Sequence, residues 1–213
     1  MPLDKYRYVV VEGPIGVGKT SLARRLAEHT GASMLLEKPE ENPFLPRFYQ
    51  DPVRHALPTQ LFFLFQRVNE VRELAQMDLF RTRTVADYLL DKDALFARIN
   101  LSDDEFSLYQ NIYNSLAPHA PAPDLVIYLQ APLDTLVERV RRRAQAYERT
   151  ISDFYMLRLA QAYSDFFHHY DAAPVLVVNS EHLDFVDNDD DFALMLKRIG
   201  EMRSQREFFS MGA

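Results

Sequence analysis

The sequence predicts an α/β fold in which a doubly wound, five-stranded parallel sheet carries helices on both faces. Short apolar segments alternate along the chain with longer segments of helical periodicity, a pattern typical of a parallel sheet with crossover helices. A glycine-rich turn over residues 13–20 joins the first apolar segment to the first helical one. The length of 213 residues and the hydrophobic content of 47% fit a single domain over residues 1–213.

The glycine-rich turn fits the phosphate-binding pattern G-x-x-x-x-G-K-[ST]. Its residues are Gly13, Pro14, Ile15, Gly16, Val17, Gly18, Lys19 and Thr20. A strand at Tyr8–Val11 is expected before it and a helix at Ser21–Glu28 after it, which is the context that the motif requires. Lys19 would reach the outer phosphates of a bound nucleotide, and the Thr20 hydroxyl would coordinate Mg²⁺. We therefore expect a sheet of the P-loop NTPase type that binds ATP or another nucleoside triphosphate.

The N-terminal half of the chain continues with two further strands and a long helix. A short strand is expected at Ser33–Leu36, and a proline-rich connection follows at residues 42–46. Apolar residues at helical spacing predict a helix over Thr59–Leu79, with Pro58 in its first turn. A weak strand is expected at Thr82–Ala86.

The C-terminal half repeats the alternation of strands and helices. Ser102–Glu105 has the form of a capping box and predicts the start of a helix. Asp124–Leu129 predicts a strand, and Pro132 the start of the helix after it. A long helix is expected at Ser152–Tyr170 and the last strand at Pro174–Val178. The acidic stretch Asp187–Asp191 favours the N-terminus of a final helix.

The composition argues against several classes of function. The absence of cysteine excludes disulfides and cysteine-based metal sites. A formal net charge of −7 argues against a nucleic-acid partner, which would need a basic surface. The densest apolar run, Leu61–Phe65, is far shorter than the ~20 residues that a membrane span needs. The first strand begins too early for a signal peptide, so we expect a cytoplasmic protein with no membrane partner.

Carboxylates follow the second and third expected strands. In an open parallel sheet, ligands bind outside the carboxyl ends of the strands, where Glu37 and Asp87 would lie. Asp87 could hold Mg²⁺ together with Thr20, or it could be a turn aspartate. A triphosphate repels a carboxylate, so Glu37 indicates a neutral hydroxyl acceptor whose proton it would take. The alternative for Glu37 is a surface ion pair with Lys38.

Five arginines lie close together in this acidic chain, in a segment of about residues 139–150. They are Arg139, Arg141, Arg142, Arg143 and Arg149. Phosphoryl transfer needs positive charge near the transferred group, and arginines on a closing lid supply it. The sequence therefore favours a lid here, the alternative being a solvated helix face.

Segments spread over most of the chain carry a resemblance to a known family. They are GPIGVGKT, EKPEENPFLPRFY, Gln60 with Arg67 seven residues later, DYLLDKDALFA, ERVRRRAQAYE and the late LDF. From Tyr8 to about Ile199 the chain resembles the deoxynucleoside kinases, especially the bacterial deoxyadenosine/deoxyguanosine kinase branch. The resemblance implies a Mg²⁺-dependent kinase that moves the γ-phosphoryl of ATP to the 5′-hydroxyl of a deoxynucleoside, with purines favoured. It also implies a homodimer built from helices, and the apolar surface of the helix near Leu61 is consistent with this.

The resemblance assigns roles at the acceptor site. Glu37 is similar to the family's general base on the 5′-hydroxyl. Glu37 and Asp87 are both expected to bind the substrate. Tyr49 and Glu148 resemble the pair that holds the 3′-hydroxyl of the sugar, where close packing disfavours ribose. From the residues alone, Tyr49 would be interpreted as a core aromatic.

The resemblance also assigns residues to the two bases. Gln60 is similar to the amide that bonds the edge of the nucleoside base, Arg67 to its neighbour in that pocket, and Phe96 to the ring that stacks on the base. Such stacking is worth about 1–3 kcal/mol. From the residues alone, Gln60 fits a helix-surface amide and Phe96 a core aromatic. Arg139 and Phe185 resemble the residues that flank the adenine of ATP.

The chain departs from the family pattern at two positions. Tyr88 follows Asp87 where many members have an arginine, and Gln145 stands where a second lid arginine is expected. Other arginines of the lid segment could supply the missing charges. Arg143 is similar to a catalytic lid arginine, acting with Lys19 on the charge that develops during transfer.

Two alternatives remain open at this point. A nucleoside monophosphate kinase of the thymidylate kinase type shares the fold and the loop, but Glu37 and the missing arginine count against it. A non-catalytic nucleotide-binding protein is opposed by the intact Gly-Lys-Thr sequence together with Glu37 and Asp87. Release of ADP with and without an added nucleoside distinguishes the three functions, because a binding protein would release none and a monophosphate kinase would respond to dTMP alone.

Overall fold

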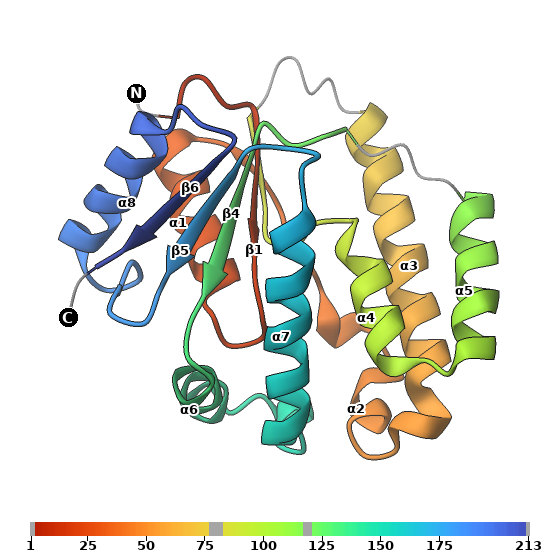
Figure 1. Ribbon diagram of the computed structural model, residues 1–213. Helices are drawn as coiled ribbons and strands as arrows, with labels where there is room; N and C mark the ends of the chain where they lie inside the picture. The colour runs from red at the N-terminus through yellow and green to blue at the C-terminus, as the bar shows by residue number, and fades with distance from the viewer. Residues whose placement is uncertain (1–2, 77–82, 117–120, 212–213) are drawn as a thin grey trace.

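The computed structural model describes residues 3–76, 83–116 and 121–211, which form a twisted parallel sheet between layers of helices (Figure 1). Within these residues the sheet has six strands in the order β2-β3-β1-β4-β5-β6. Their bounds are β1 Tyr8–Glu12, β2 Ser33–Leu35, β3 Thr84–Ala86, β4 Leu125–Gln130, β5 Val175–Asn179 and β6 Arg206–Ser210. Every pairing is parallel. The chain adds β2 and β3 on one side of β1 and then β4, β5 and β6 on the other, so a switch point lies beside β1. Ligands of open α/β sheets bind at such a switch point.

Helices cover both faces of the sheet, as the sequence predicts. Their bounds are α1 Lys19–Thr30, α2 Leu45–Phe48, α3 Pro52–Gln76, α4 Lys92–Asn100, α5 Asp103–Leu116, α6 Leu133–Arg143, α7 Asp153–His169 and α8 Asp189–Glu201. Alternate residues of β1 point to opposite faces: Val9 and Val11 pack with α1 and α8, whereas Val10 packs with α7. No helix in the described ranges is both long and apolar enough to cross a membrane.

A third apolar cluster lies beyond α4, where α2, α3 and α5 pack together. Its buried members include Phe48, Leu64, Val68, Leu101 and Tyr109. Figure 1 shows α3 and α5 side by side at one edge of the molecule, with α2 at the same end as the carboxyl ends of the strands. This cluster fixes one wall of the site described below.

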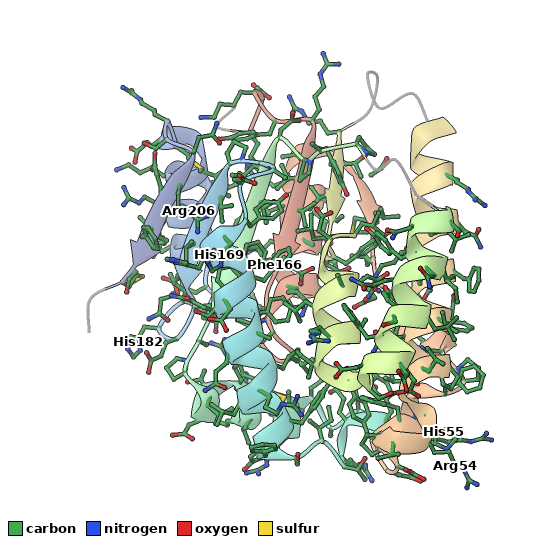
Figure 2. The ribbon with its side chains drawn as sticks, turned by 45° about the vertical axis from the view of Figure 1, so that its right-hand side comes forward. Arg54, His55, Phe166, His169, His182 and Arg206 are labelled. Atoms are coloured by element: carbon green, nitrogen blue, oxygen red, sulfur yellow. The ribbon has the colours of Figure 1, made fainter. Side chains whose placement is uncertain are left out.

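The strand β6 was not expected from the sequence. Among the described strands it is an edge strand that pairs with β5 alone. It contains charged residues and an exposed Phe208, and Phe209 is its buried apolar residue. Arg206 holds it in place by donating hydrogen bonds to the carbonyls of Phe167 and Tyr170. Figure 2 shows Arg206 beside the C-terminal end of α7, near His169 and Phe166. These contacts are tertiary and leave no pattern in the sequence.

The start of α3 was predicted wrongly. The helix begins at Pro52 rather than Thr59, and Pro58 lies inside it instead of in its first turn. Asp51 explains the earlier start, because its carboxylate accepts a hydrogen bond from the N–H of Arg54 (3.3 Å) in the manner of a helix cap. The expected end at Leu79 lies outside the described residues. The short helices α2 and α4 were not predicted.

The capping box at the start of α5 is present, and we expect it to contribute measurably to stability. The N–H of Ser102 donates to the Glu105 carboxylate (3.0 Å), and the N–H of Glu105 donates back to the Ser102 hydroxyl (3.4 Å). Ser102→Ala should lower the free energy of unfolding by about 1 kcal/mol in urea titrations. Ser107→Ala, which removes an exposed hydroxyl of the same helix, should cost less than about 0.5 kcal/mol. Equal losses in the two variants would refute the capping role.

Candidate active site

A cleft of about 1140 Å³ opens at the carboxyl ends of the strands. The P-loop after β1, the start of α3 and the segment after α6 border it. Every site residue predicted from the sequence lines this cleft except Gly13 and Pro14, which lie at the start of the loop. Residues from distant parts of the chain therefore meet in one place, as the sequence analysis requires.

The P-loop has the backbone geometry that its glycines permit. Gly13 has φ +150°, and a Cβ there would lie 2.2 Å from the carbonyl oxygen of Leu129. Gly18 has φ +100° and precedes α1. The Lys19 ammonium donates to the carbonyls of Gly13 (2.7 Å) and Pro14 (3.2 Å), and burial lowers its pKa. The loop thus holds a cation over the position at which phosphates bind in such motifs.

Asp87 connects the P-loop to the end of β2. Its carboxylate accepts a hydrogen bond from the Thr20 hydroxyl (2.5 Å) and another from the N–H of Glu37 (2.7 Å). Burial raises the pKa of Asp87, and the hydrogen bonds from Thr20 and Glu37 offset this effect only in part. Asp87 is therefore part of the site and is not merely a turn residue.

The Thr20 and Asp87 oxygens are suitable ligands for Mg²⁺. Hydroxyl and carboxylate oxygens are what this hard cation prefers, and the close approach of the two groups allows both to face one ion. Among the described residues no group of three or more histidine, cysteine, aspartate or glutamate side chains could hold a metal. A magnesium ion here would thus need water and nucleotide phosphates as its other ligands, which is its usual arrangement in kinases.

Glu37 is the most strongly perturbed carboxylate of the cleft. It pairs with Arg67 and lies 3.4 Å from the Lys92 ammonium. Burial acts to raise its pKa, but Lys92, Arg67 and Lys19 together lower the pKa of Glu37 to about 2. The alternative of a surface pair with Lys38 is wrong, because Lys38 pairs with Glu41 (3.5 Å). Glu37 is therefore an ionised carboxylate inside the cleft.

Tyr49 and Glu148 line the cleft together near the short 3₁₀ turn Ala146–Glu148. Burial raises the pKa of Tyr49, and Tyr155 and Glu148 add to this effect. The Tyr49 ring also packs against Phe48 and Tyr155, so it is a packed aromatic and a lining residue at once. Its position beside a buried carboxylate suits recognition of a sugar hydroxyl.

Gln60, Arg67 and Phe96 lie along the same wall. Gln60 is buried and borders the cleft, so it is not a helix-surface amide. Arg67 pairs with both Glu37 and Asp93, a contact that the sequence did not indicate. Arg67 Nε and Asp93 Oδ2 are buried without a hydrogen-bond partner. Of these two residues, Arg67 lines the cleft and Asp93 lies behind it, fully buried.

The opposite end of the cleft is built from α6 and the loop after β5, which carries His182 (Figure 2). Arg139 donates hydrogen bonds to the carbonyl (2.8 Å) and hydroxyl (3.2 Å) of Ser180. Phe185 packs against Gly18 of the P-loop. Arg25 fixes this loop through the carbonyls of Phe185 and Val186. Arg25 was not singled out from the sequence, because these contacts arise only in the folded chain.

The arginines of the lid segment have different surroundings. Arg143 pairs with Glu148, and Arg141 pairs with Asp153 (3.0 Å). Arg142 lines the cleft and is exposed. Arg149 is also exposed but is not among the lining residues. None of the described contacts of these arginines reaches Glu37. The lid and the role of Arg143 in catalysis therefore stay predictions.

Two buried charged residues of the site were missed in the sequence analysis. Glu12 ends β1 directly before Gly13, and Lys92 begins α4. They form an ion pair of 3.3 Å, and both are almost fully buried. A signal for Glu12 was present, since a charged residue at the end of an otherwise apolar strand needs a buried partner.

The fold and the site define a nucleotide-binding phosphotransferase of the kinase type, with a phosphate-binding loop and a pair of oxygens suited to Mg²⁺. Comparison with known proteins gives the family. Residues 9–203 match the family described as "Deoxynucleoside kinase", so the chain belongs to the deoxynucleoside kinase family.

Curated relatives cover almost the whole chain. A deoxyadenosine kinase of Lactobacillus acidophilus is 31% identical over 207 residues, which cover 91% of this chain and 94% of the relative. A deoxyguanosine kinase of Bacillus subtilis is 32% identical over 200 residues, which cover 92% and 97%. The sequence resemblance to this branch is thereby confirmed.

Solved structures confirm the fold. A deoxyadenosine kinase from M. mycoides with the products dCMP and a flexible dCDP bound has a TM-score of 0.80 and 22% identity, covering 92% of this chain and 100% of that chain. The same enzyme with bound dATP has a TM-score of 0.79 and 21% identity, covering 91% and 100%.

Proposed function

We propose that this kinase transfers the γ-phosphoryl group of ATP to the 5′-hydroxyl of a purine deoxynucleoside, deoxyadenosine or deoxyguanosine. The observation that carries the proposal is Glu37, an ionised carboxylate in the same cleft as the P-loop and joined to it through Asp87. A carboxylate at this point suits a neutral hydroxyl acceptor. The purine preference is supported by relatives named as deoxyadenosine and deoxyguanosine kinases.

In the proposed reaction the 5′-hydroxyl oxygen attacks the γ-phosphorus. The bond from this phosphorus to the β,γ-bridging oxygen breaks, and ADP leaves with the electron pair. Glu37 orients the hydroxyl and accepts its proton, while Lys19 stabilises the charge on the phosphate oxygens. Arg143 is proposed to turn from Glu148 toward the transferred group when the lid of residues 139–150 closes.

Thr20 and Asp87 would hold Mg²⁺ in this reaction. When bound, the ion would neutralise part of the charge on the triphosphate. The donor base is proposed to lie between Arg139 and Phe185, at the end of the cleft formed by α6 and the loop after β5. The acceptor base would lie against Phe96 with its edge at Gln60 and Arg67.

A panel of acceptors tests the proposed function. ADP formation from Mg²⁺-ATP would be measured with deoxyadenosine, deoxyguanosine, deoxycytidine, thymidine, adenosine and dTMP. The proposal expects the highest kcat/KM for one or both purine deoxynucleosides. Turnover of dTMP alone would indicate a monophosphate kinase, and no turnover with any acceptor would indicate a nucleotide-binding protein without this activity.

The Tyr49 hydroxyl is expected to bind the 3′-hydroxyl of the sugar. Tyr49→Phe should lower kcat/KM for deoxyadenosine roughly 3- to 10-fold, because one hydrogen bond contributes about 0.5–1.5 kcal/mol. The control is 2′,3′-dideoxyadenosine, which lacks this hydroxyl and should be turned over equally by both proteins. An equal loss with both substrates would mean that Tyr49 acts through packing alone.

We also propose a homodimer in which α3 and α5 form the interface. Phe65 on α3 and Leu108 on α5 expose about half of their side chains, and the two helices pack side by side. Light scattering should give about twice the mass of one chain, and Phe65→Asp should shift the protein to the monomer. A monomeric wild type would contradict this proposal.

We further propose that the enzyme acts in the cytoplasm, in nucleotide salvage.

A further inference from the structure

A buried ammonium group lies beside the acceptor carboxylate. Lys92 is only 1% exposed but borders the cleft. Its Nζ lies 3.3 Å from Oε2 of Glu12 and 3.4 Å from Oε2 of Glu37. Burying an ammonium is costly unless carboxylates balance its charge, and here two of them do. The two carboxylates, of Glu12 and Glu37, differ in how far their positions depend on Lys92.

Glu12 has enough hydrogen-bond partners without Lys92. Its carboxylate accepts from the N–H of Gly13 (2.9 Å), the N–H of Leu89 (2.8 Å) and the hydroxyl of Tyr163 (3.0 Å). These donors come from the P-loop, the segment after β3 and α7, so Glu12 is fixed from three sides. The Glu12 carboxylate is therefore held in place independently of Lys92, and its ion pair fixes the position of the Lys92 ammonium.

Glu37 depends more strongly on Lys92. The partners found for its carboxylate are Arg67 and Lys92. Arg67 is shared with the fully buried Asp93, so its charge is divided between two carboxylates. Without Lys92, the carboxylate of Glu37 would keep Arg67 alone and would lose its connection to β1.

The contacts of Glu37 lead to both ends of the P-loop. From the start of the loop they run through Glu12 and Lys92 to the Glu37 carboxylate. From its end they run from Thr20 through Asp87 to the Glu37 backbone. The backbone contact places the residue, but the contact through Lys92 orients the carboxylate itself.

We propose that Lys92 is a positioning residue for phosphoryl transfer. Its ammonium fixes the orientation of the Glu37 carboxylate relative to the P-loop. This inference rests on the proposed function. The transfer itself is as described above: the acceptor proton goes to Glu37, and no proton or electron pair passes through Lys92. Because a misplacement of about 1 Å can cost on the order of a hundredfold in rate, the loss of Lys92 should appear in kcat.

The test compares Lys92→Met with the wild type under saturating Mg²⁺-ATP and deoxyadenosine or deoxyguanosine. We expect kcat to fall roughly 30- to 100-fold while KM for ATP changes by less than about threefold. The matched control is Lys38→Met, which removes a half-exposed lysine adjacent to Glu37 in the sequence and should leave kcat unchanged. Thermal unfolding shows whether each variant is folded.

A second pair of variants separates positioning from other roles. In a Glu37→Gln background, Lys92→Met should cause no further loss beyond about threefold, because Lys92 acts through the carboxylate that is already gone. If Lys92→Met does not fold, Glu12→Gln with Lys92→Met removes the buried ion pair and carries the same test. Circular dichroism would verify that this double variant is folded.

The outcomes are distinct from failure of the proposed function. A wild type that phosphorylates no deoxynucleoside would refute the function itself. An active wild type whose Lys92 variants keep kcat within about threefold would overturn the positioning role. A loss that multiplies with that of Glu37→Gln would overturn it as well, because Lys92 would then act independently of Glu37.

Discussion

Replacing Glu37 with glutamine is expected to lower kcat for the deoxynucleoside by at least about a hundredfold. The amide has nearly the same shape as the carboxylate but cannot accept the proton of the 5′-hydroxyl. It also leaves Arg67 and Lys92 without their shared negative partner at the end of β2. Steady-state ADP formation at saturating ATP measures the effect.

The control for this variant is Glu41→Gln. Glu41 is a partly exposed carboxylate that pairs with Lys38 outside the set of catalytic residues, and its replacement should leave kcat unchanged. Binding of ATP to Glu37→Gln should remain close to that of the wild type, because the P-loop is intact. A Glu37→Gln enzyme with more than about a tenth of the wild-type kcat would exclude Glu37 as the general base.

Replacing Lys19 with methionine is expected to lower kcat by roughly a hundred- to a thousandfold. The ammonium lies over the P-loop on the carbonyls of Gly13 and Pro14, and Lys19 lines the cleft. Methionine retains most of the apolar stem but removes the charge that would stabilise the phosphate oxygens during transfer. Single-turnover measurements with saturating nucleotide separate this loss from weaker ATP binding.

Lys197→Met is the matched control for Lys19. Lys197 is exposed on α8 and pairs with Glu201 (3.9 Å), so its loss should change neither kcat nor KM. If Lys19→Met changed only the affinity for ATP and kept the single-turnover rate, Lys19 would bind the ground state without stabilising the transition state.

Much of the fold follows from local patterns in the sequence. The strands β1, β4 and β5 are short apolar runs, and the capping box at Ser102 marks the start of α5. The errors arise where a local signal was ambiguous or absent. Pro58 is typical of a first helical turn, but in the folded chain it is tolerated inside α3. The strand β6 is fixed by hydrogen bonds from Arg206 to Phe167 and Tyr170.

The site was predictable to the extent that motifs name its residues. The P-loop and the carboxylates after β2 and β3 were identified, and the structure brings them into one cleft. The partners of these residues were not predictable, because they come from elsewhere in the chain. Arg67 reaches Glu37 from α3, and Lys92 reaches it from α4. Ion pairs of this kind depend on tertiary packing and leave no spacing pattern.

The most direct measurement of the central claim is product identification after incubation with ATP labelled at the γ-phosphorus. The account predicts that label appears in the 5′-monophosphate of deoxyadenosine or deoxyguanosine, in an amount equal to the ADP formed, and that Glu37→Gln nearly abolishes it. Label appearing in a diphosphate formed from an added monophosphate, with none transferred to a deoxynucleoside, would contradict it.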